Sequence, residues 1–303
     1  MPITKVADIP EDLRLIYSRE TLRDALPQMH FRQLVQTRQE AKEAGDTIKF
    51  RRLNNVNRGG QLVDEDTPIQ QNKMTSSEIQ VPLDEFGNAI SFTRKASKSS
   101  VISLLDEAKL LLAEDYSLVI DSFLRDTFLN TLNKYYMAAN GDDGGANNAV
   151  AGGFSDDGLD GIVEMAKMLS FPKFNRGGDQ FWVFVGTARQ IRQIRNSEKW
   201  LDARRYVNPS DMLTGEAGRL EGVIFVDSTQ MNEVEIPTAS LNSKDIHRGL
   251  LVGARSVGFG ESIPLELIPG PLEDYGRKQS IAWYSIAGAG ILNDYIIDVR
   301  TEE

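Results

Sequence analysis

The stretch that decides the fold is VISLLDEAKLLLAEDYSLVIDSFLRDTFLNTLNKYYM, residues 101–137. Apolar side chains recur in it at steps of three and four residues, charged side chains lie between them, and neither Gly nor Pro interrupts the pattern. The pattern predicts one helix of about 35 residues, roughly 50 Å long, ending before the NGDDGG of residues 140–145. Because helices of this length usually span a molecule, we expect the other elements to be arranged around it.

Upstream of the helix, residues 47–97 predict a long β-hairpin. A strand pattern opens at residues 48–53, residues 54–72 are polar, and a second apolar alternation follows. We interpret residues 84–88, which read DEFGN, as a turn within that second alternation. The apolar stripe is too thin for two strands to be stable alone in water, so we expect the hairpin to rest on a partner.

Residues 1–46 predict an arm made of two amphipathic helices, 12–27 and 28–44, separated at Pro27. The apolar stripes of these helices are narrow, so the arm must lie on another surface. Residues 1–60 carry 11 Lys and Arg against 8 Asp and Glu, whereas residues 61–303 carry 23 against 36. The basic start suits an anionic partner, either nucleic acid or an acidic neighbouring subunit, although a solvated helix face rich in Arg gives the same count.

Downstream of the long helix, helix and strand patterns alternate. Helices are predicted at residues 159–169 and 187–196, the second capped by Thr187. Strands are predicted at residues 181–185, 222–227, 250–260, 265–268, 281–287 and 295–299. The chain therefore reads as an α+β protein with a hairpin and an arm attached to its body.

The composition excludes several kinds of chemistry. The chain has no Cys, which removes disulfides, Cys-ligated metals and thiol nucleophiles, and its only histidines are His30 and His247. The GFG of residues 258–260 and the GAG of residues 288–290 each lack the third glycine of a phosphate-binding loop. We predict no catalytic site, no metal and no cofactor. No apolar run approaches the ~20 residues that span a bilayer, so we also predict no membrane partner.

One further segment is unusual: residues 214–229, which read TGEAGRLEGVIFVDST. Its glycines allow tight backbone turns. Glu216 and Arg219 lie three residues apart and can pair with each other or across an interface. An ordinary loop that leads into a strand explains the same spacing. The assembly candidates in it are Gly215, Glu216, Gly218, Arg219 and Gly222.

The order of these elements, the Glu198-Lys199-Trp200 segment and the Gly-Glu-x-Gly-x-x-x-Gly-Val spacing of residues 215–223 resemble tailed-bacteriophage major capsid proteins. The resemblance covers nearly the whole chain and implies the Johnson fold, which tailed-phage and herpesvirus shells share. By position it implies an N-terminal arm, an E-loop hairpin, a peripheral domain around the spine helix and an axial domain. Their ranges would be 1–46, 47–97, 98–156 with 263–303, and 157–262.

The resemblance implies a structural protein and not an enzyme. Copies would assemble into hexamers and pentamers of an icosahedral shell that encloses double-stranded DNA without reading its sequence. It implies a separate scaffolding protein, because the arm is too short to carry a fused scaffold, together with a portal and decoration proteins. The protein would be made in the cytoplasm of a bacterial host and would end in the virion capsid. Glu216 and Arg219 would pair between subunits, and Trp200, Phe86 and Phe31 are additional assembly candidates.

Two alternatives remain at this stage. An encapsulin, a bacterial compartment with the same fold and an enzyme cargo, would carry a cargo-binding N-terminal helix with a more apolar face. A soluble carboxylate-dependent hydrolase would need a concave pocket that holds paired Asp or Glu residues.

Overall fold

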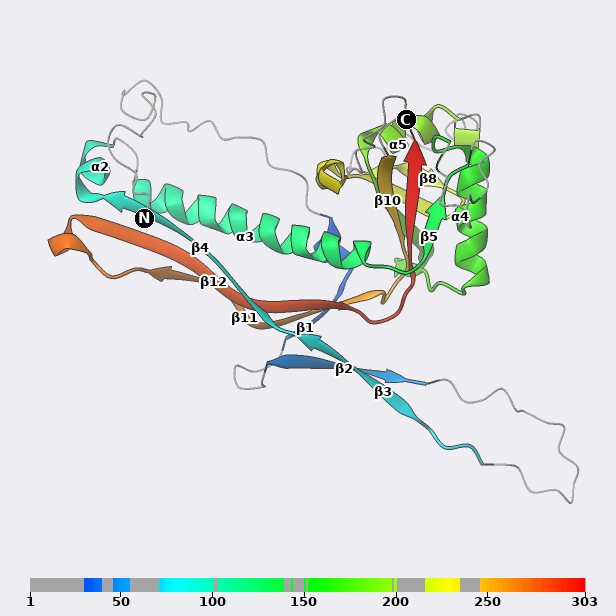
Figure 1. The fold of residues 1–303 in the computed structure, drawn as a ribbon, viewed down its shortest axis with the longest axis horizontal. Helices are drawn as coiled ribbons and strands as arrows, with labels where there is room; N and C mark the ends of the chain where they lie inside the picture. The colour runs from blue at the N-terminus through cyan, green and yellow to red at the C-terminus, as the bar shows by residue number, and fades with distance from the viewer. Residues whose placement is uncertain are drawn as a thin grey trace, which may run out of the picture.

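One long helix connects two β-sheets in the described part of the chain. The computed structural model describes residues 30–39, 46–54, 71–100, 103–138, 143, 150, 152–197, 199–200, 216–234 and 246–302. The helix is α3, Leu104–Leu129, and we call it the spine helix. Figure 1 shows it above long strands on the left, with a compact lobe at its right-hand end and a hairpin projecting below.

The sheets join strands that are far apart in sequence. The four-stranded sheet has the order β1 (Gln36–Gln39), β11 (Val257–Pro269), β12 (Lys278–Ile291) and β4 (Asp84–Thr93). The seven-stranded sheet has the order β5 (Lys134–Tyr136), β13 (Ile296–Glu302), β10 (Ile246–Val252), β7 (Asp179–Gly186), β9 (Val223–Asp227) and β8 (Glu216–Leu220), and β6 (Phe174–Arg176) pairs with β7. A separate two-stranded sheet contains β2 (Thr47–Leu53) and β3 (Ser76–Pro82).

Shorter helices complete the described elements. They are the α-helices α2 (Arg94–Ser99), α4 (Asp156–Met168) and α5 (Ala188–Arg195), and the 3₁₀ helices η2 (Phe31–Gln33), η5 (Thr229–Val234) and η6 (Asp274–Gly276). The helix predictions at 159–169 and 187–196 are confirmed, and Thr187 caps α5 in a reciprocal capping box with Gln190. Among the described residues, no helix is both long and apolar enough to cross a membrane.

The spine helix has a buried stripe with a strict four-residue period. The buried apolar residues are Ala108, Leu112, Tyr116, Ile120, Leu124 and Phe128. Four residues advance a helix by about 400°, so this stripe turns by about 40° at each step. At the middle of the helix Tyr116 packs edge-on against Trp283 of β12, and at its end Phe128 packs against Phe31 of η2. The helix can therefore contact different partners along its length.

The two sheets share a hydrophobic core at the end of the spine helix. Successive residues of β7 point to opposite faces of its sheet. Val183 and Val185 belong to the same buried cluster as Leu124, whereas Trp182 and Phe184 belong to a second cluster that includes the apolar face of α4. The seven-stranded sheet is thus covered on one face by the spine helix and on the other by α4 and α5.

The spine helix is shorter than the sequence predicts. It spans 26 residues and ends at Leu129, not near residue 137. The Thr131 hydroxyl donates to the Ile296 carbonyl (3.0 Å), and the Asn133 side-chain amide donates to the Asp294 carbonyl (2.8 Å). These bonds direct the chain into β5, which pairs in parallel with β13. The partners are more than 160 positions away in sequence, so the local helical period does not reveal them.

The predicted turn at residues 84–88 is wrong. These residues belong to β4, which pairs antiparallel with β12 from Asp84–Ala287 to Thr93–Lys278. The hairpin consists of β2 and β3 alone, paired from Thr47–Pro82 to Leu53–Ser76. The long strand β12 provides a continuous partner for residues 84–93, which overrides the local turn signal. The projecting hairpin therefore ends at Pro82, before the predicted limit of residue 97.

The arm prediction is wrong where the structure describes it. Residues 30–39 form one 3₁₀ turn and then β1, not part of a helix over 28–44. β1 pairs in parallel with β11 and completes that edge of the four-stranded sheet. The apolar spacing of Phe31, Leu34 and Val35 exists because all three pack on one cluster. The predicted helix at 12–27 lies outside the described residues.

The strand predicted over 250–260 is two strands. β10 ends at Val252 and β11 begins at Val257, and the two belong to different sheets. The predicted division of residues 263–303 from 157–262 does not follow the sheets either. β12 belongs to the sheet under the spine helix, whereas β13 pairs with β10 in the other sheet. Long-range pairing decides this partition, and local strand signals contain no information about it.

The buried stripe of the spine helix makes a direct prediction about stability. Leu124→Ala should lower the free energy of unfolding by about 2–5 kcal/mol, because it leaves a cavity in the shared core. Leu110→Ala is the matched control on the same helix, since Leu110 is 47% exposed, and it should cost less than about 0.5 kcal/mol. Urea denaturation of unassembled protein measures both losses. Equal losses would contradict this assignment of the buried stripe.

Candidate assembly surfaces

A short segment of the arm is anchored on the spine helix. Phe31 is fully buried against Phe128, with ring centroids 5.7 Å apart. The buried carboxylate of Asp121 accepts the backbone N–H groups of His30 (3.2 Å) and Arg32 (3.1 Å). Burial raises the pKa of Asp121, and these N–H donors offset part of that rise. Phe31 therefore acts inside its own copy, where it holds the point at which the arm leaves the body.

The Arg32 side chain extends this anchor to β11. Its guanidinium lies 3.4 Å from Glu261 Oε1 and stacks over the rings of Tyr116 and Phe259. The Tyr116 hydroxyl donates to the same carboxylate at 2.6 Å. Burial, together with the hydrogen bond to Glu261, raises the pKa of Tyr116, so the hydroxyl remains a donor at neutral pH. One polar network thus joins the arm, the spine helix and β11.

Four glycines form the floor on which the projecting hairpin stands. They are paired across β11 and β12, Gly258 with Gly290 and Gly260 with Gly288. A Cβ atom at any of them would come closer than 3.0 Å to the hairpin base. The residues it would meet are Phe50, Ile48, Val81 and Pro82. Only glycine allows the hairpin to pack this closely on the sheet.

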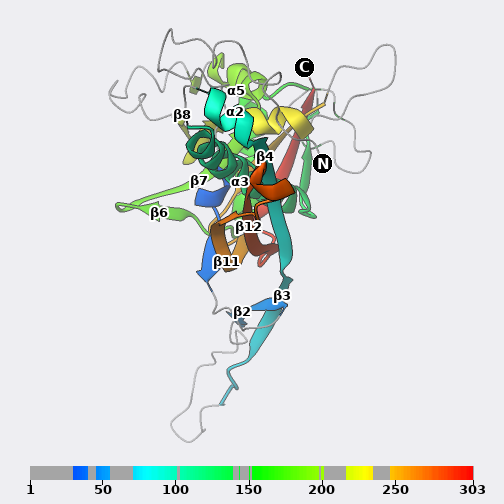
Figure 2. The same cartoon turned by 90° about the vertical axis from the view of Figure 1, so that its left-hand side faces the viewer.

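The hairpin has a small core at its base and exposed strands beyond it. Ile48, Phe50 and Val81 form a cluster with Leu292 that is separate from the two main cores. Leu53, at the end of β2, is 63% exposed, and Met74, just before β3, is 78% exposed. Figure 2 shows the hairpin projecting away from the body below the four-stranded sheet. The outer part of the hairpin therefore has little of its own chain to pack against among the described residues.

The segment predicted as a loop before residue 223 forms an edge strand. β8 pairs antiparallel with β9, and a bulge lies between Glu216 and Gly218. Glu221 and Gly222 both have positive φ angles, 51° and 78°, which is the backbone of a tight two-residue hairpin turn. Gly222 is thus required by the β8–β9 turn. Gly215 and the Glu216 side chain lie outside what the structure describes.

Gly218 makes room for Trp200 within the same copy. A Cβ atom on Gly218 would lie 2.4 Å from the Trp200 ring, and its φ of 140° also disfavours other residues. Trp200 is 3% exposed and packs edge-on against Phe225, with ring centroids 5.3 Å apart. Trp200 is therefore a core residue of the lobe and not an exposed contact.

The remaining candidates lie in different places. Arg219 is exposed on β8, where its guanidinium lies 3.5 Å from Asp179 and donates to the Gln180 carbonyl at 3.2 Å. Phe86 is half-buried on β4 and packs against Phe123 of the spine helix, with ring centroids 5.1 Å apart. The structure brings Gly218 together with Trp200, but it does not gather the eight candidates into one surface.

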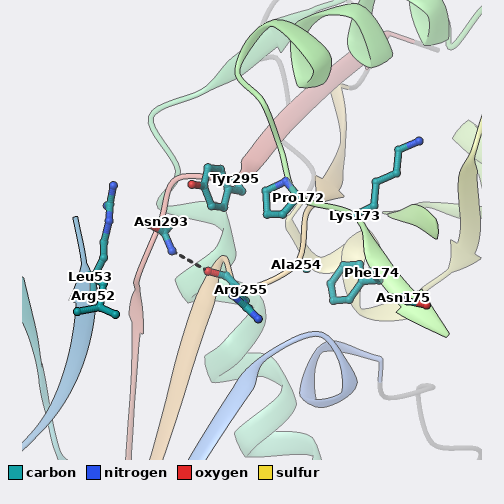
Figure 3. Close-up of a pocket in the computed structure, with 10 residues that line it drawn as sticks. All are labelled: Arg52, Leu53, Pro172, Lys173, Phe174, Asn175, Ala254, Arg255, Asn293 and Tyr295. Carbon is teal, nitrogen blue, oxygen red and sulfur yellow. Dashed lines mark hydrogen bonds between the residues drawn. The ribbon is translucent and has the colours of Figure 1, made fainter. Parts of the chain in front are cut away.

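A basic groove lies between the hairpin, the lobe and the start of β11. Its volume is about 690 Å³, and Figure 3 shows ten residues that line it. Arg52 of β2, Lys173 of the segment before β6 and Arg255 of the turn before β11 are in its lining, and in Figure 3 the ammonium end of Lys173 points away from the other lining residues. No residue in this lining is acidic. The lining of the groove therefore carries only positive formal charges.

Exposed apolar side chains gather at the free end of the β11–β12 pair. They belong to Leu267, Ile268, Leu272 and Tyr275, which are 39%, 45%, 67% and 105% exposed. Figure 1 places this end beside α2, far from the lobe. A cluster of exposed apolar side chains at one tip is typical of a surface that contacts another protein.

The sequence matches no family model and no curated protein. Its structure aligns with a chain from the capsid of Ralstonia phage GP4 at a TM-score of 0.73 and 15% identity, over 94% of each chain. It aligns with a chain from the cyanophage Pam1 capsid asymmetric unit at 0.70 and 15% identity, over 94% of this chain and 96% of that one. A chain from the acid-stable capsid of Helicobacter pylori bacteriophage KHP30 gives 0.71 and 13%, over 100% and 98%. The chain has the phage capsid fold.

The capsid fold confirms the predicted α+β class, but several residues that build its surfaces were not predicted. The glycine floor is present in the sequence as GFG at 258–260 and GAG at 288–290, motifs whose spacing was tested only against phosphate-binding loops. Two such motifs in neighbouring strands could have indicated a close backbone approach. Asp121 and Glu261, which hold the arm, gave no comparable signal because their partners are 91 and 229 positions away.

The glycine floor of the capsid fold predicts a specific clash and its relief. Gly260→Ala should cost about 1–3 kcal/mol of folding free energy, because the new Cβ would lie 2.4 Å from Ile48 Cδ1. Ile48→Val in the same chain removes that atom and should recover part of the loss. Gly288→Ala has no such rescue, since it meets the Pro82 backbone carbonyl at 2.0 Å. Denaturation midpoints of the variants decide the matter, and an unchanged midpoint for Gly260→Ala would contradict the close packing.

Proposed function

We propose that this chain is the major capsid protein of a tailed bacteriophage, and that copies of it assemble into hexamers and pentamers of an icosahedral shell. The observation that carries the proposal is the projecting hairpin in a chain with the phage capsid fold. The hairpin stands on a core of Ile48, Phe50, Val81 and Leu292, and its outer strands are exposed. An isolated two-stranded hairpin is marginally stable in water, so a partner surface should support it.

A second copy of the chain is the partner that this shape requires. The hairpin on one side and the exposed apolar tip of β11–β12 on the other are different surfaces, so they cannot make a contact between identical patches. Contacts between unlike surfaces generate rings when the rotation closes. Hexamers and pentamers are such rings, and each copy would give its hairpin to one neighbour and receive one from the other.

The predicted parts of the shell protein can be restated on this fold. The peripheral domain would contain the spine helix and the four-stranded sheet, and the axial domain would contain the seven-stranded sheet with α4 and α5. The E-loop would be the β2–β3 hairpin, and residues before 31 would form the arm that reaches neighbouring copies. Asp121 and Glu261 support this role for the arm because they fix its point of departure.

The charge balance supports a wall that encloses DNA and does not grip it. The chain carries a net charge of −10, and an acidic wall repels phosphate groups. Packaged double-stranded DNA would then remain free to enter and leave. A separate scaffolding protein, a portal and decoration proteins would act with it, synthesis would occur in the cytoplasm of a bacterial host, and the role would be structural and not enzymatic.

The proposal predicts particles of megadalton size. Purified protein, alone or with the scaffolding protein of its phage, should form capsomers or closed shells, because the hairpin and the apolar tip are buried only on assembly. Light scattering after size exclusion measures the mass, and negative-stain images show the shape. Packaged DNA would separate a virion from an encapsulin, which holds protein cargo. A stable monomer under all these conditions would contradict the proposal.

Arg219 and Glu216 test the predicted pairing between subunits. Arg219→Ala or Glu216→Ala should reduce particle yield about tenfold. A tenfold change corresponds to a loss of roughly 1.4 kcal/mol of association free energy at the contact between subunits. Folding should change little, because the pair of Arg219 with Asp179 inside the copy is exposed.

The matched control is Asp179→Ala, which removes only the pair within the copy. It should leave particle yield unchanged in the same light-scattering assay. If Arg219→Ala and Asp179→Ala behave alike, Arg219 acts inside its own copy and the pairing between subunits is wrong.

A further inference from the structure

The basic groove is built from segments that are far apart in the sequence. Arg52 comes from the hairpin, Lys173 from the segment that follows α4, and Arg255 from the turn between β10 and β11. The ammonium group of Lys173 lies over the Trp182 ring, 4.4 Å from its centroid, and in Figure 3 it points away from the other lining residues. The guanidinium groups of Arg52 and Arg255 make no ion pair with any described residue. Two arginines without an acidic partner in the lining give the groove a positive potential, which favours a bound anion.

The conformation of Arg255 supports a functional reading of the groove. Its φ is 60°, in the left-handed region that glycine and asparagine prefer. The surrounding hydrogen bonds hold it there. Ala254 N–H donates to the Pro172 carbonyl (2.9 Å), and the Asn293 side chain donates to the Arg255 carbonyl (3.1 Å), as Figure 3 shows. Glycine would satisfy this turn without strain, so the arginine side chain is retained at a conformational cost.

The lining of the groove favours an acidic peptide over a bare phosphate chain. Leu53, Phe174 and Tyr295 contribute apolar surface beside the two arginines. A ligand with carboxylates next to apolar side chains matches both kinds of surface. This chain contains a single run of three consecutive acidic residues, Asp64-Glu65-Asp66. Leu62 and Val63 precede that run, and Pro68 and Ile69 follow it within three positions.

We propose that the groove of one copy binds the acidic run at residues 64–66 of a second copy. The inference rests on the proposed capsid function and identifies a receptor surface for the hairpin within it. In the sequence the run lies between β2 and β3, whose last pair is Leu53 with Ser76, so it belongs to the segment that joins the two strands of the hairpin. In a ring, each copy would offer one acidic run and one groove, and both surfaces would be used once.

Electrostatics sets the expected strength of this contact. Exposed ion pairs are individually weak and are screened within about 8–10 Å at ordinary ionic strength. In a closed ring these weak ion pairs act together, because every copy makes the same contact at the same time. The contact should therefore control the protein concentration at which particles form, and it should weaken as salt rises.

Charge reversal tests the pairing directly. Chains with Arg52→Glu and Arg255→Glu, or with Asp64→Lys and Asp66→Lys, should each need at least about tenfold more protein to form particles at low salt. Both pairs of substitutions in one chain should restore assembly. An equal mixture of the two singly reversed chains should restore hexamers, because the two chains can alternate around a six-membered ring and each groove then finds a complementary run on the other chain. A five-membered ring would keep one mismatched contact, so the mixture is scored by its hexamers. Light scattering against protein concentration measures all four samples, with wild type as the reference.

A second variant separates binding from folding. Arg255→Gly removes the charge and also the backbone strain, so its unfolding midpoint should be unchanged or higher while its particles need more protein to form. Arg255→Lys, which keeps the charge, should assemble close to wild type. Normal assembly of Arg255→Gly and of the reversed groove would overturn the proposal.

The other outcomes identify what the groove does instead. If the doubly reversed chain assembles but the mixture forms no hexamers, the run binds the groove of its own copy, and the contact between copies is wrong. If groove reversal leaves empty shells intact and lowers only their retention of DNA, the groove binds nucleic acid and the proposal is overturned. If wild type forms no particles, the proposed function itself fails, and that result is distinct from every outcome above.

Discussion

The rest of the structure depends on the four-residue period of the spine helix. Because its buried stripe turns by about 40° per step, one helix packs on Trp283 of the four-stranded sheet and then ends in the core shared with the other sheet. Its C-terminus is held there by Arg248 of β10, which donates to the Leu129 carbonyl and pairs with the buried Asp298 at 2.7 Å. If the buried residues had followed the usual alternation of three- and four-residue steps, the stripe would have stayed on one side of the helix and packed on a single sheet.

This rigid body determines where the two projecting parts leave it. The arm leaves at Phe31, which is buried against the last turns of the spine helix, and the hairpin leaves over the glycine floor of β11 and β12. Both points are fixed by close packing, whereas the described residues at the outer end of the hairpin, Leu53 and Met74, are exposed. A rigid point of departure with an exposed extension is suited to the contacts between copies that we propose.

Much of the fold could be predicted from local patterns, and the failures share one cause. The spine helix, α4, α5 and β7 are visible because their apolar periods match the surfaces that bury them. Residues 84–88, 30–39 and 130–137 were misassigned because β12, β11 and β13, all distant in sequence, take them as strands or redirect them. Among the site residues, Trp200 and Phe31 were predicted as assembly candidates, but both side chains are buried within the copy. Burial depends on what packs over a side chain, and single-chain periodicity does not contain that information.

By itself, the sequence determined the class of the fold, the central helix and the presence of two extensions too thin to fold alone. It also determined the absence of thiol chemistry and the acidic balance of the chain. Only the tertiary structure decided which strands pair, that the two GxG motifs form a floor under the hairpin, and that Arg52 and Arg255 line one groove. The physical reason is that helical period and composition are local properties, whereas strand pairing and the groove join residues more than 200 positions apart along the chain.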